Sequence, residues 1–247
     1  MLNKFYIFLL ILILLIIFVY KNKLFECFEE PNLVIPKILH LIWIGDKKTP
    51  ENITSWTNNF KTANPDWTVK VWGNKEIDEL NLVNKKQFNE MKEYSGKADI
   101  ARYEIIYRYG GMYIDADTFW LENPIKPEFL KGTINFFREH EHLIANGWIT
   151  AVKNHPFLKL VIDELPKKNI SEAAWISVGP TLITDVYNGI KDKESYDIHF
   201  VDVKDILCPF SWHGISNEKY DVLLKECQEE KRAFAFHYGL STNHFIN

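Results

Sequence analysis

The sequence predicts an α/β fold with a sheet covered by helices on both faces. Three observations support this. Beyond residue 34, short apolar runs alternate with segments of helical periodicity, as in chains that build helices onto a sheet. A pair of glycines at 110–111 separates one such helical segment from a short apolar run that ends in two aspartates. The chain of 247 residues is long enough for one domain of catalytic size with a large core.

The predicted strands are short apolar or alternating runs bounded by proline, glycine or polar residues. The run 38–44 follows Pro36 and precedes Gly45, which suits a buried strand, and 67–72 alternates between apolar and polar residues. Further strands are expected at 112–114, 133–137, 148–152, 199–203 and 233–237.

Helical periodicity predicts helices between these strands. The segment 97–109 ends at Gly110 and Gly111, as a helix with a glycine C-cap does. The other helices are expected at 51–62, 87–93, 156–164 and 181–188.

The N-terminus predicts a membrane anchor. Residues 5–20 are sixteen consecutive apolar or aromatic residues flanked by Lys4, Lys21 and Lys23, and as a helix they would span about 24 Å. No small-x-small cleavage site follows, which favours an uncleaved anchor over a signal peptide. The flanking charges nearly balance, so they do not decide the orientation. We therefore expect an anchor at 1–23, a stem at 24–34 and one domain at 35–247.

Composition disfavours two classes of protein. The chain has 29 Lys and Arg against 33 Asp and Glu, a net charge of −4, so it lacks the strongly basic surface typical of nucleic-acid binding. Cys27, Cys208 and Cys227 stand singly without metal-ligand spacing, which suggests neither a zinc module nor a disulfide scaffold. A bridge between Cys208 and Cys227 remains an open alternative.

The residues with the clearest chemistry are Asp115 and Asp117, at the end of the run 112–114. In a strand, residues i and i+2 point to the same side, so both carboxylates could converge on one cation if strand geometry persists. Mg²⁺ and Mn²⁺ prefer oxygen ligands and are commonly bound by one or two carboxylates with substrate phosphates. A short D-x-D is also common in polar turns, so its context must decide.

That context includes Asp99 and Arg102, which lie at i and i+3 on one face of the predicted helix. Such a pair can be a surface salt bridge, which is common and weak. It can also be a carboxylate that accepts sugar hydroxyl groups beside a guanidinium that binds hydroxyls or phosphate.

Together these residues resemble glycosyltransferase family 32, over about 35–118 and more loosely to His237. The resemblance is carried by Ile35-Pro36-Lys37-Ile38-x-His40-x-Ile42-Trp43 and by Ala98-Asp99-x-x-Arg102-Tyr103-x-x-x-Tyr107-x-x-Gly110-Gly111-x-Tyr113-x-Asp115-x-Asp117. That family includes the initiating α-1,6-mannosyltransferases of the fungal Golgi and mannosyltransferase subunits that act on inositol phosphoceramide. The resemblance implies a GT-A-like fold with a central mixed sheet, a nucleotide-sugar donor, a divalent Mn²⁺ or Mg²⁺ ion, and retention of anomeric configuration.

The resemblance also implies roles for individual residues. Asp115 would face the ribose and donor sugar, and Asp117 would bind the metal directly, with Asp115 as its second carboxylate. Asp99 and Arg102 would hold donor-sugar hydroxyls. Tyr103 would lie with them in the donor site, and Trp43 would lie against the nucleotide base, although a tryptophan in an apolar run is commonly a core residue.

Three later residues fit the family pattern less closely. Asn146 resembles an asparagine near the sugar site, or belongs to a simple Asn-Gly turn. Gly179 precedes a proline that opens a helix, as in the family, or marks a plain helix N-terminus. His237 is the candidate for a further metal or diphosphate ligand, or is an ordinary hydrogen-bonded histidine. The family often has two histidines and a tryptophan there, whereas this chain has His237-Tyr238-Gly239.

The functional expectation is a metal-dependent transferase that moves a hexose to a glycan or glycolipid acceptor. Mannose from GDP-mannose is favoured, and a UDP-sugar is possible. The anchor and the sequons at 52–54 and 169–171 favour a type II membrane protein with its domain in the ER or Golgi lumen. The alternatives are a galactosyl-, glucosyl- or N-acetylglucosaminyltransferase of the same fold, an inactive carbohydrate-binding protein, and an anchored interaction protein without sugar chemistry.

Overall fold

The computed structural model describes residues 34–49, 51–121, 123–208 and 217–237. These residues belong to one compact unit, Val34–Asn247. Within them, no helix combines the length and the apolar character that a membrane span requires. The predicted anchor, and the stem up to Leu33, lie outside the described residues.

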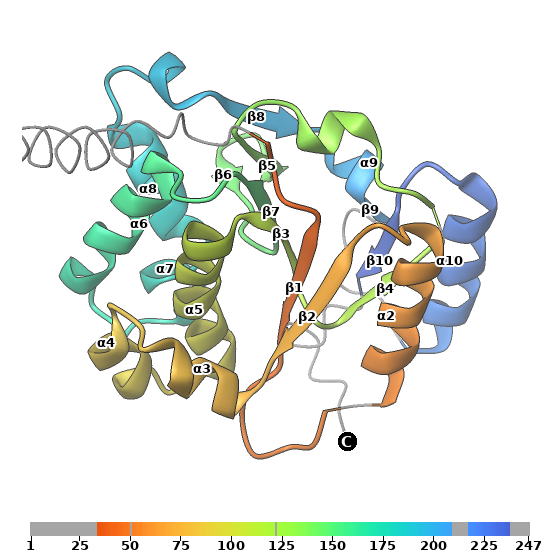
Figure 1. Ribbon diagram of the computed structural model, residues 1–247, viewed down its shortest axis with the longest axis horizontal. Coiled ribbons are helices and arrows are strands. Elements are labelled where there is room, and N and C mark those ends of the chain that lie inside the picture. The colour runs from red at the N-terminus through yellow and green to blue at the C-terminus, as the bar shows by residue number, and fades with distance from the viewer. Residues whose placement is uncertain (1–33, 50, 122, 209–216, 238–247) are drawn as a thin grey trace, which may run out of the picture. The chain divides into compact units, whose positions relative to one another are not determined.

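A mixed sheet forms the centre of this unit (Figure 1). Seven strands of the described chain join in the order β2-β1-β3-β7-β5-β6, with β8 paired to β5. β1 pairs in parallel with β2 and β3, and β5 pairs in parallel with β8, whereas the pairings of β7 and β6 are antiparallel. The strands are β1 (Ile38–Ile42), β2 (Thr68–Trp72), β3 (Gly111–Ile114), β5 (Ile134–His140), β6 (Leu143–Ile144), β7 (Trp148–Ala151) and β8 (Ile198–Val201).

A second sheet of three described strands lies beyond β3 along the chain. β4 (Thr118–Trp120) pairs antiparallel with β10 (Ala235–His237), and β10 pairs in parallel with β9 (Leu207–Cys208). The sequence predicts the strand at β10 but neither β4 nor β9, because runs of two or three residues are too short to show a period. β4 begins one residue after Asp117, so this sheet borders the aspartate pair.

Helices cover both faces of the central sheet, as predicted. The predicted helices correspond to α2 (Glu51–Ala63), α4 (Lys85–Glu90), α5 (Tyr94–Tyr109), α6 (Pro156–Glu164) and α8 (Pro180–Gly189). Figure 1 shows α5, α6 and α8 on one side of the strands and α2 on the other. Further helices, which the sequence does not predict, are α3 (Asn74–Leu80), α7 (Ala174–Ser177), α9 (Val203–Ile206) and α10 (Asn217–Glu230).

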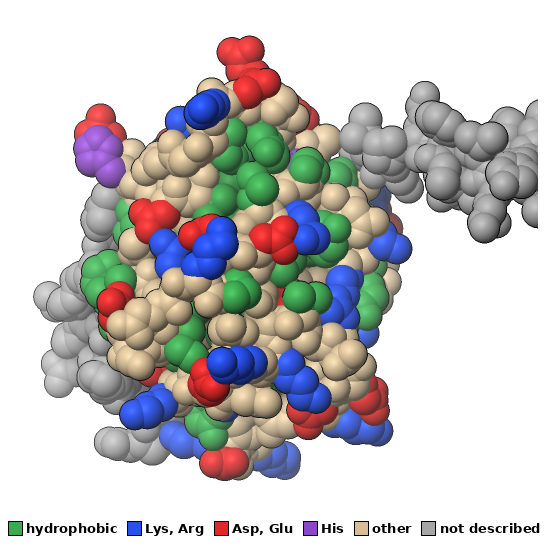
Figure 2. Space-filling model, turned by 90° about the vertical axis from the view of Figure 1, so that its left-hand side faces the viewer, with side chains coloured by type: hydrophobic (Ala, Val, Ile, Leu, Met, Phe, Trp, Pro, Cys, Tyr) green, Lys and Arg blue, Asp and Glu red, His purple; other side chains and the backbone are tan. Residues whose placement is uncertain are grey.

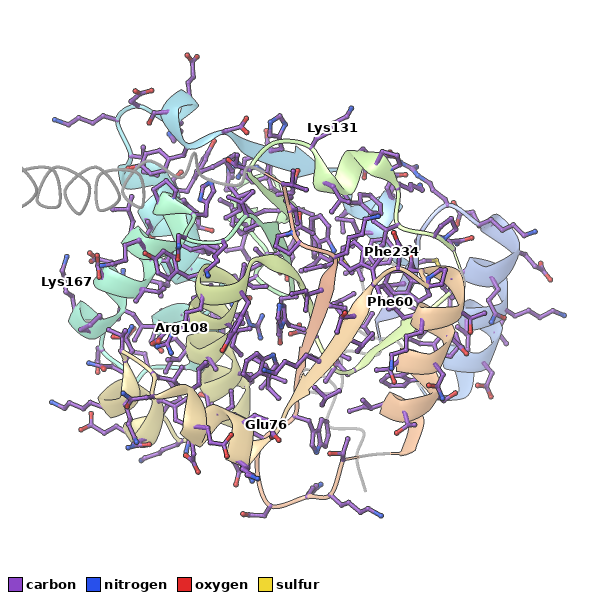
Figure 3. The ribbon with its side chains drawn as sticks, viewed as in Figure 1. Phe60, Glu76, Arg108, Lys131, Lys167 and Phe234 are labelled. Carbon is purple, nitrogen blue, oxygen red and sulfur yellow. A yellow bond between two sulfur atoms is a disulfide. The ribbon has the colours of Figure 1, made fainter. Side chains whose placement is uncertain are left out.

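The sheet separates the two larger of the three apolar clusters found among the described residues. One packs α5, α6 and α8 against one face. The other packs α2 and the second sheet against the opposite face, where Phe60 and Phe234 each lie 4.5 Å from the ring of Trp120, centroid to centroid (Figure 3). Aromatic contacts of this kind bury large areas and hold α2 and the second sheet in place beside β3.

The junction between α5 and β3 is fixed by close packing. Gly110 and Gly111 both have positive φ, +64° and +96°, which favours glycine. A Cβ atom at Gly111 would lie 2.4 Å from the carbonyl oxygen of Ile38. His40 completes the junction because its Nδ1 accepts from Trp72 Nε1 at 3.1 Å and its Nε2 donates to the Gly110 carbonyl at 3.0 Å. The indole can only donate, so the ring of His40 is neutral, with its proton on Nε2.

The neutral state of His40 makes the stability of the protein depend on pH. Burial lowers the pKa of His40 from 6.5 to about 4, so the unfolded chain binds more protons between these values. The stability that the neutral His40 ring contributes is fully present above pH 6.5. It is lost as the pH falls below that value, by up to roughly 1.4 kcal/mol per pH unit. The free energy of unfolding in urea should fall between pH 7.5 and pH 5 in both proteins. We expect the fall to be smaller for His40→Gln than for the wild type, by a difference of roughly 1–2 kcal/mol. Equal losses in the two proteins would contradict this account.

A disulfide joins Cys208 to Cys227, with a Cα–Cα distance of 5.8 Å. It ties β9 to α10, and β9 in turn pairs with β10. This resolves the alternative that the sequence leaves open. Cys27 lies outside the described residues.

Replacing both cysteines by serine is expected to lower the free energy of unfolding by roughly 3 kcal/mol, because the bridge closes a loop with a sequence separation of 19. Denaturation with and without reductant measures this. Reductant should destabilise the wild type by a similar amount and leave the double serine variant unchanged. A wild type that is indifferent to reductant would show that the bridge does not support the fold.

Candidate active site

The aspartate pair lies in a turn between β3 and β4. The strand predicted at 112–114 ends at Ile114, as expected, and the condition that strand geometry persists through Asp117 is not met, because Thr118 N donates to the Asp115 carbonyl at 3.1 Å. The turn forms because the chain leaves the central sheet here and enters the second one. The side chains of Asp115 and Asp117 are both partly exposed, at the end of β3 where the carboxyl end of β1 also lies.

Arg102 pairs with two carboxylates, that of Asp99 on its own helix α5 and that of Asp115 in the turn after β3. Its Nη2 lies 2.9 Å from Asp99 Oδ1 and 3.1 Å from Asp115 Oδ1, and its Nη1 donates to the Asn146 carbonyl at 2.6 Å. The guanidinium also lies 4.4 Å from the ring centroid of Tyr113. Asp99 and Arg102 are buried, so they do not form an ordinary surface salt bridge. Arg102 Nε is buried and has no hydrogen-bond partner among the described residues.

A second layer of hydrogen bonds orients this group. Asn146 Nδ2 donates to Asp99 Oδ1 at 2.8 Å and to the Tyr103 hydroxyl at 3.0 Å. The Tyr103 hydroxyl lies 3.0 Å from the Val178 carbonyl and 3.3 Å from the Gly179 carbonyl. Tyr103 is fully buried. The geometry therefore connects Tyr103 to the carboxylates through Asn146 and to the segment before α8.

Burial and mutual charge perturb the titratable groups. Burial raises the pKa of Asp99 to about 6, with Asp115 adding to the rise and Arg102 opposing it. Burial also raises the pKa of Tyr113, whose hydroxyl donates to Asp115 Oδ1 at 2.8 Å. With Asp99 and Asp115 ionised, the group around Arg102 carries a net negative charge, to which Asp117 adds another. Such a charge suits a divalent cation.

Two glycines allow close approach to these carboxylates. A Cβ atom at Gly147 would lie 2.6 Å from Asp115 Oδ2, and one at Gly179 would lie 3.1 Å from Asp99 Oδ2. The Asp115 backbone N–H also donates to the Gly147 carbonyl at 3.0 Å. Both glycines thus leave space around a carboxylate oxygen that a side chain would fill.

The remaining predicted residues lie around this group. Trp43 follows β1 directly, is partly exposed, and donates from Nε1 to the Lys47 carbonyl at 3.2 Å. The register of β10 on β4 places His237 opposite Thr118, next to Asp117 in the chain, but the His237 side chain lies outside the description. Within the described part of the chain, no three potential metal-ligating side chains cluster. Hard divalent cations are commonly bound by one or two carboxylates together with substrate phosphates, and Asp115 and Asp117 are both partly exposed at this turn.

Sequence reasoning misses Tyr113 and Gly147 as site residues. Tyr113 could have been found, because it lies two residues before Asp115 and shares its side of the strand. Gly147 could not have been found from the sequence. Its importance for the site depends on contact with the Asp115 side chain, which is more than thirty residues away in the sequence.

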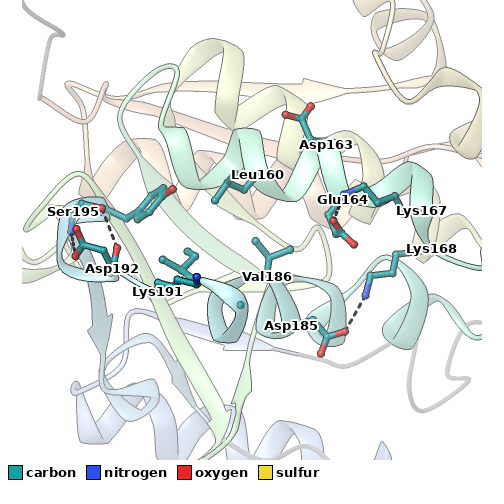
Figure 4. A pocket seen from close by; sticks show the side chains of 13 residues that line it. Leu160, Asp163, Glu164, Lys167, Lys168, Asp185, Val186, Lys191, Asp192 and Ser195 are labelled. Atoms are coloured by element: carbon teal, nitrogen blue, oxygen red, sulfur yellow. Dashed lines mark hydrogen bonds and ion pairs between the residues drawn. The ribbon is translucent and has the colours of Figure 1, made fainter.

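A groove of about 610 Å³ lies elsewhere, between α6 and α8. None of the predicted site residues lines it. Figure 4 shows two of its lysines paired with carboxylates, Lys168 with Asp185 at 3.0 Å and Lys167 with Glu164 at 2.6 Å. Figure 2, which views the side of the molecule that carries α6 and α8, shows the two signs of charge interspersed. This surface therefore lacks the unbalanced charge and the buried carboxylates of the candidate site.

Residues 50–159 match the family described as "Glycosyltransferase sugar-binding region containing DXD motif". This range includes Asp99, Arg102, Asp115, Asp117 and Asn146. Over this range the chain resembles the DXD-containing glycosyltransferases. Its aspartate pair is thus a glycosyltransferase motif in a matching sequence context, and the prediction of a transferase is confirmed.

Similar proteins whose names state an activity support the same class of enzyme. The chain is 28% identical over 164 residues to inositol phosphoceramide mannosyltransferase 1 of Schizosaccharomyces pombe, covering 61% of this chain and 50% of that protein. It is 29% identical over 182 residues to mannosyl phosphorylinositol ceramide synthase of Saccharomyces cerevisiae, covering 66% and 45%. An uncharacterized glycosyltransferase of Acanthamoeba polyphaga mimivirus is 28% identical over 184 residues, covering 69% and 72%. The chain spans about half the length of the two yeast relatives.

The fold agrees with this assignment. The ligand-free glycosyltransferase domain of the YGT toxin superimposes with a TM-score of 0.52 at 11% identity, covering 69% of this chain and 80% of that domain. The predicted GT-A-like fold with a central mixed sheet is confirmed for the described residues.

Proposed function

We propose that this glycosyltransferase moves a hexose, with mannose favoured, from a nucleotide sugar to a glycan or glycolipid acceptor. The observation that carries the proposal is the pairing of the buried Asp99 and Arg102 with the partly exposed Asp115, next to Asp117 in a partly exposed turn. The names of the inositol phosphoceramide mannosyltransferases support mannose, and with it GDP-mannose as donor, over UDP-sugars.

In this proposal Asp117 and Asp115 hold a Mn²⁺ or Mg²⁺ ion with the donor diphosphate, and His237 is a further candidate ligand. The bound ion would act as a Lewis acid that stabilises the charge developing on the diphosphate. Net negative charge around Arg102 and the carboxylate oxygens next to Gly147 support this assignment.

The chain's own residues then position the donor. Asp99 accepts hydroxyls of the donor sugar through the oxygen that faces Gly179, and Arg102 fixes both Asp99 and Asp115 in place. Asn146 and Tyr103 act through Asp99 as positioning residues, since both are buried and hydrogen-bonded within the protein. Trp43, at the carboxyl end of β1, offers a partly exposed ring to the base. Fixed geometry of this kind lowers the barrier to transfer. We assign no nucleophile or base and propose retention of configuration from the resemblance alone.

We also propose that residues 1–23 anchor the protein, residues 24–34 form a stem, and the domain 35–247 faces an oxidising compartment such as the ER or Golgi lumen. The Cys208–Cys227 disulfide supports this placement, since disulfides persist in oxidising environments.

The test is donor turnover by the full-length protein in detergent, with GDP-mannose and a panel of UDP-sugars, in Mn²⁺ and in chelator. We expect chelator-sensitive hydrolysis or transfer from GDP-mannose, with the α-configured product identified by NMR. Turnover of a UDP-sugar instead would keep the enzyme class and replace mannose. Absence of both turnover and metal-dependent nucleotide binding would overturn the proposal.

A further inference from the structure

Trp175, on α7, is an exposed aromatic residue beside the candidate site. Its exposed fraction is 58%, the highest for any Trp, Tyr or Phe in the described part of the chain. Tryptophan is usually well buried, and exposed aromatic surface next to a substrate site commonly marks a binding surface.

Packing against α5 and α8 holds Trp175 close to Asp99. A Cβ atom added at Gly179 would lie 2.8 Å from Trp175 Cα and also 3.1 Å from Asp99 Oδ2, so only a glycine separates the two residues. The same turn is fixed to α5 by the Tyr103 hydroxyl, which contacts the carbonyls of Val178 and Gly179. α7 contacts α5 directly (Figure 1). The position of Trp175 is therefore coupled to the hydrogen-bonded group that contains Arg102.

The surroundings of Trp175 suit a sugar. One face of a pyranose ring presents C–H groups that pack on an indole, while its hydroxyls need polar partners. Two exposed carboxylates belong to residues near Trp175. Glu172 precedes Trp175 by three residues, and Glu93 accepts from the backbone N–H of the neighbouring Ala174 at 3.0 Å. Their negative charge fits hydroxyl donors and repels the anionic headgroups of a membrane surface.

A difference in side-chain exposure distinguishes the position beside Trp175 from the position assigned to the donor sugar. Asp99, assigned above to the donor, is 6% exposed, whereas Trp175 on the other side of Gly179 is largely exposed. We propose that Trp175 is the stacking surface for a pyranose ring of the acceptor, in a subsite that includes Glu93 and Glu172. This inference rests on the proposed function, because it takes the inner position to be filled by the donor sugar.

The test measures sugar binding to the full-length protein with Mn²⁺ and GDP present. The probes are the methyl α- and β-glycosides of mannose, galactose and glucose, followed by saturation-transfer NMR. Incorporated 5-fluorotryptophan, with the Trp175 signal assigned from Trp175→Phe, locates the contact. We expect at least one glycoside to shift the Trp175 signal saturably, Trp175→Ala to weaken its binding at least tenfold, and Trp175→Phe to retain most of the affinity. Val222→Ala on α10 is the control, since Val222 is also 58% exposed.

Three results would overturn the inference: no glycoside shifts the Trp175 signal, Trp175→Ala binds the glycosides as the wild type does, or Trp175→Ala only weakens binding to phosphatidylcholine–phosphatidylserine vesicles. Failure of the proposed function looks different, because it is an absence of metal-dependent donor turnover in the wild type itself. Glycoside binding at Trp175 without such turnover would show that Trp175 binds sugars but would overturn its assignment to an acceptor.

Discussion

Asp117→Asn is expected to reduce metal-dependent donor turnover by roughly 100-fold or more while the fold stays intact. In the proposed site this carboxylate holds the cation that stabilises the departing diphosphate, and loss of one preorganised charge partner has an effect of that size. Its side chain is partly exposed in the turn after β3, so the change in stability should be within about 0.5 kcal/mol. Turnover at saturating Mn²⁺ and thermal unfolding measure the two effects.

Asp163→Asn is the matched control for this experiment. Asp163 lies on α6 in the groove of Figure 4, outside the candidate site, and its ion pair with Lys159 is exposed. Such pairs contribute little to stability, so this variant should keep full turnover. A folded Asp117→Asn protein with turnover like that of Asp163→Asn would remove Asp117 from the metal site.

Arg102→Met should be the most destabilising single change at the site. It removes a cation that contacts both Asp99 and Asp115 and leaves their carboxylates close together, one of them buried. Breaking one partner out of a buried ion pair costs about 3–5 kcal/mol. Urea denaturation at pH 7.5 measures this loss. Arg102→Lys, which keeps the charge but not the paired N–H groups, should lose less.

The pH dependence of this variant distinguishes lost charge pairing from lost packing. Arg102 lowers the pKa of Asp99, which burial has already raised to about 6, so removing Arg102 raises that pKa further. A carboxyl whose folded pKa exceeds its unfolded value gains folded-state stability as the pH falls. The deficit of Arg102→Met should therefore shrink between pH 7.5 and 5, and adding Asp99→Asn should recover part of it at pH 7.5. A deficit that does not change with pH would assign the loss to packing.

Local sequence signals predict most of the central fold. The strand at β1, the helix at α5 and its end at Gly110 follow from apolar period and glycine chemistry, and the structure reproduces them within a few residues. β4 and β9 are not predictable in this way, because segments of two or three residues exist only through pairing with β10. α7 has only four residues, and it exists because it packs against α5 and α8.

At the site, the chemical groups follow from the chain alone: an aspartate pair after two glycines, and a carboxylate and guanidinium one helical turn apart. Motif spacing suffices for this, because it is a property of the chain. The three-dimensional packing adds that Arg102 pairs with Asp115 as well as Asp99, that Asp117 lies in a turn, and that Gly179 brings Trp175 close to Asp99. These relations depend on how α5, the end of β3 and the segment before α8 pack together, which spacing along the chain does not specify.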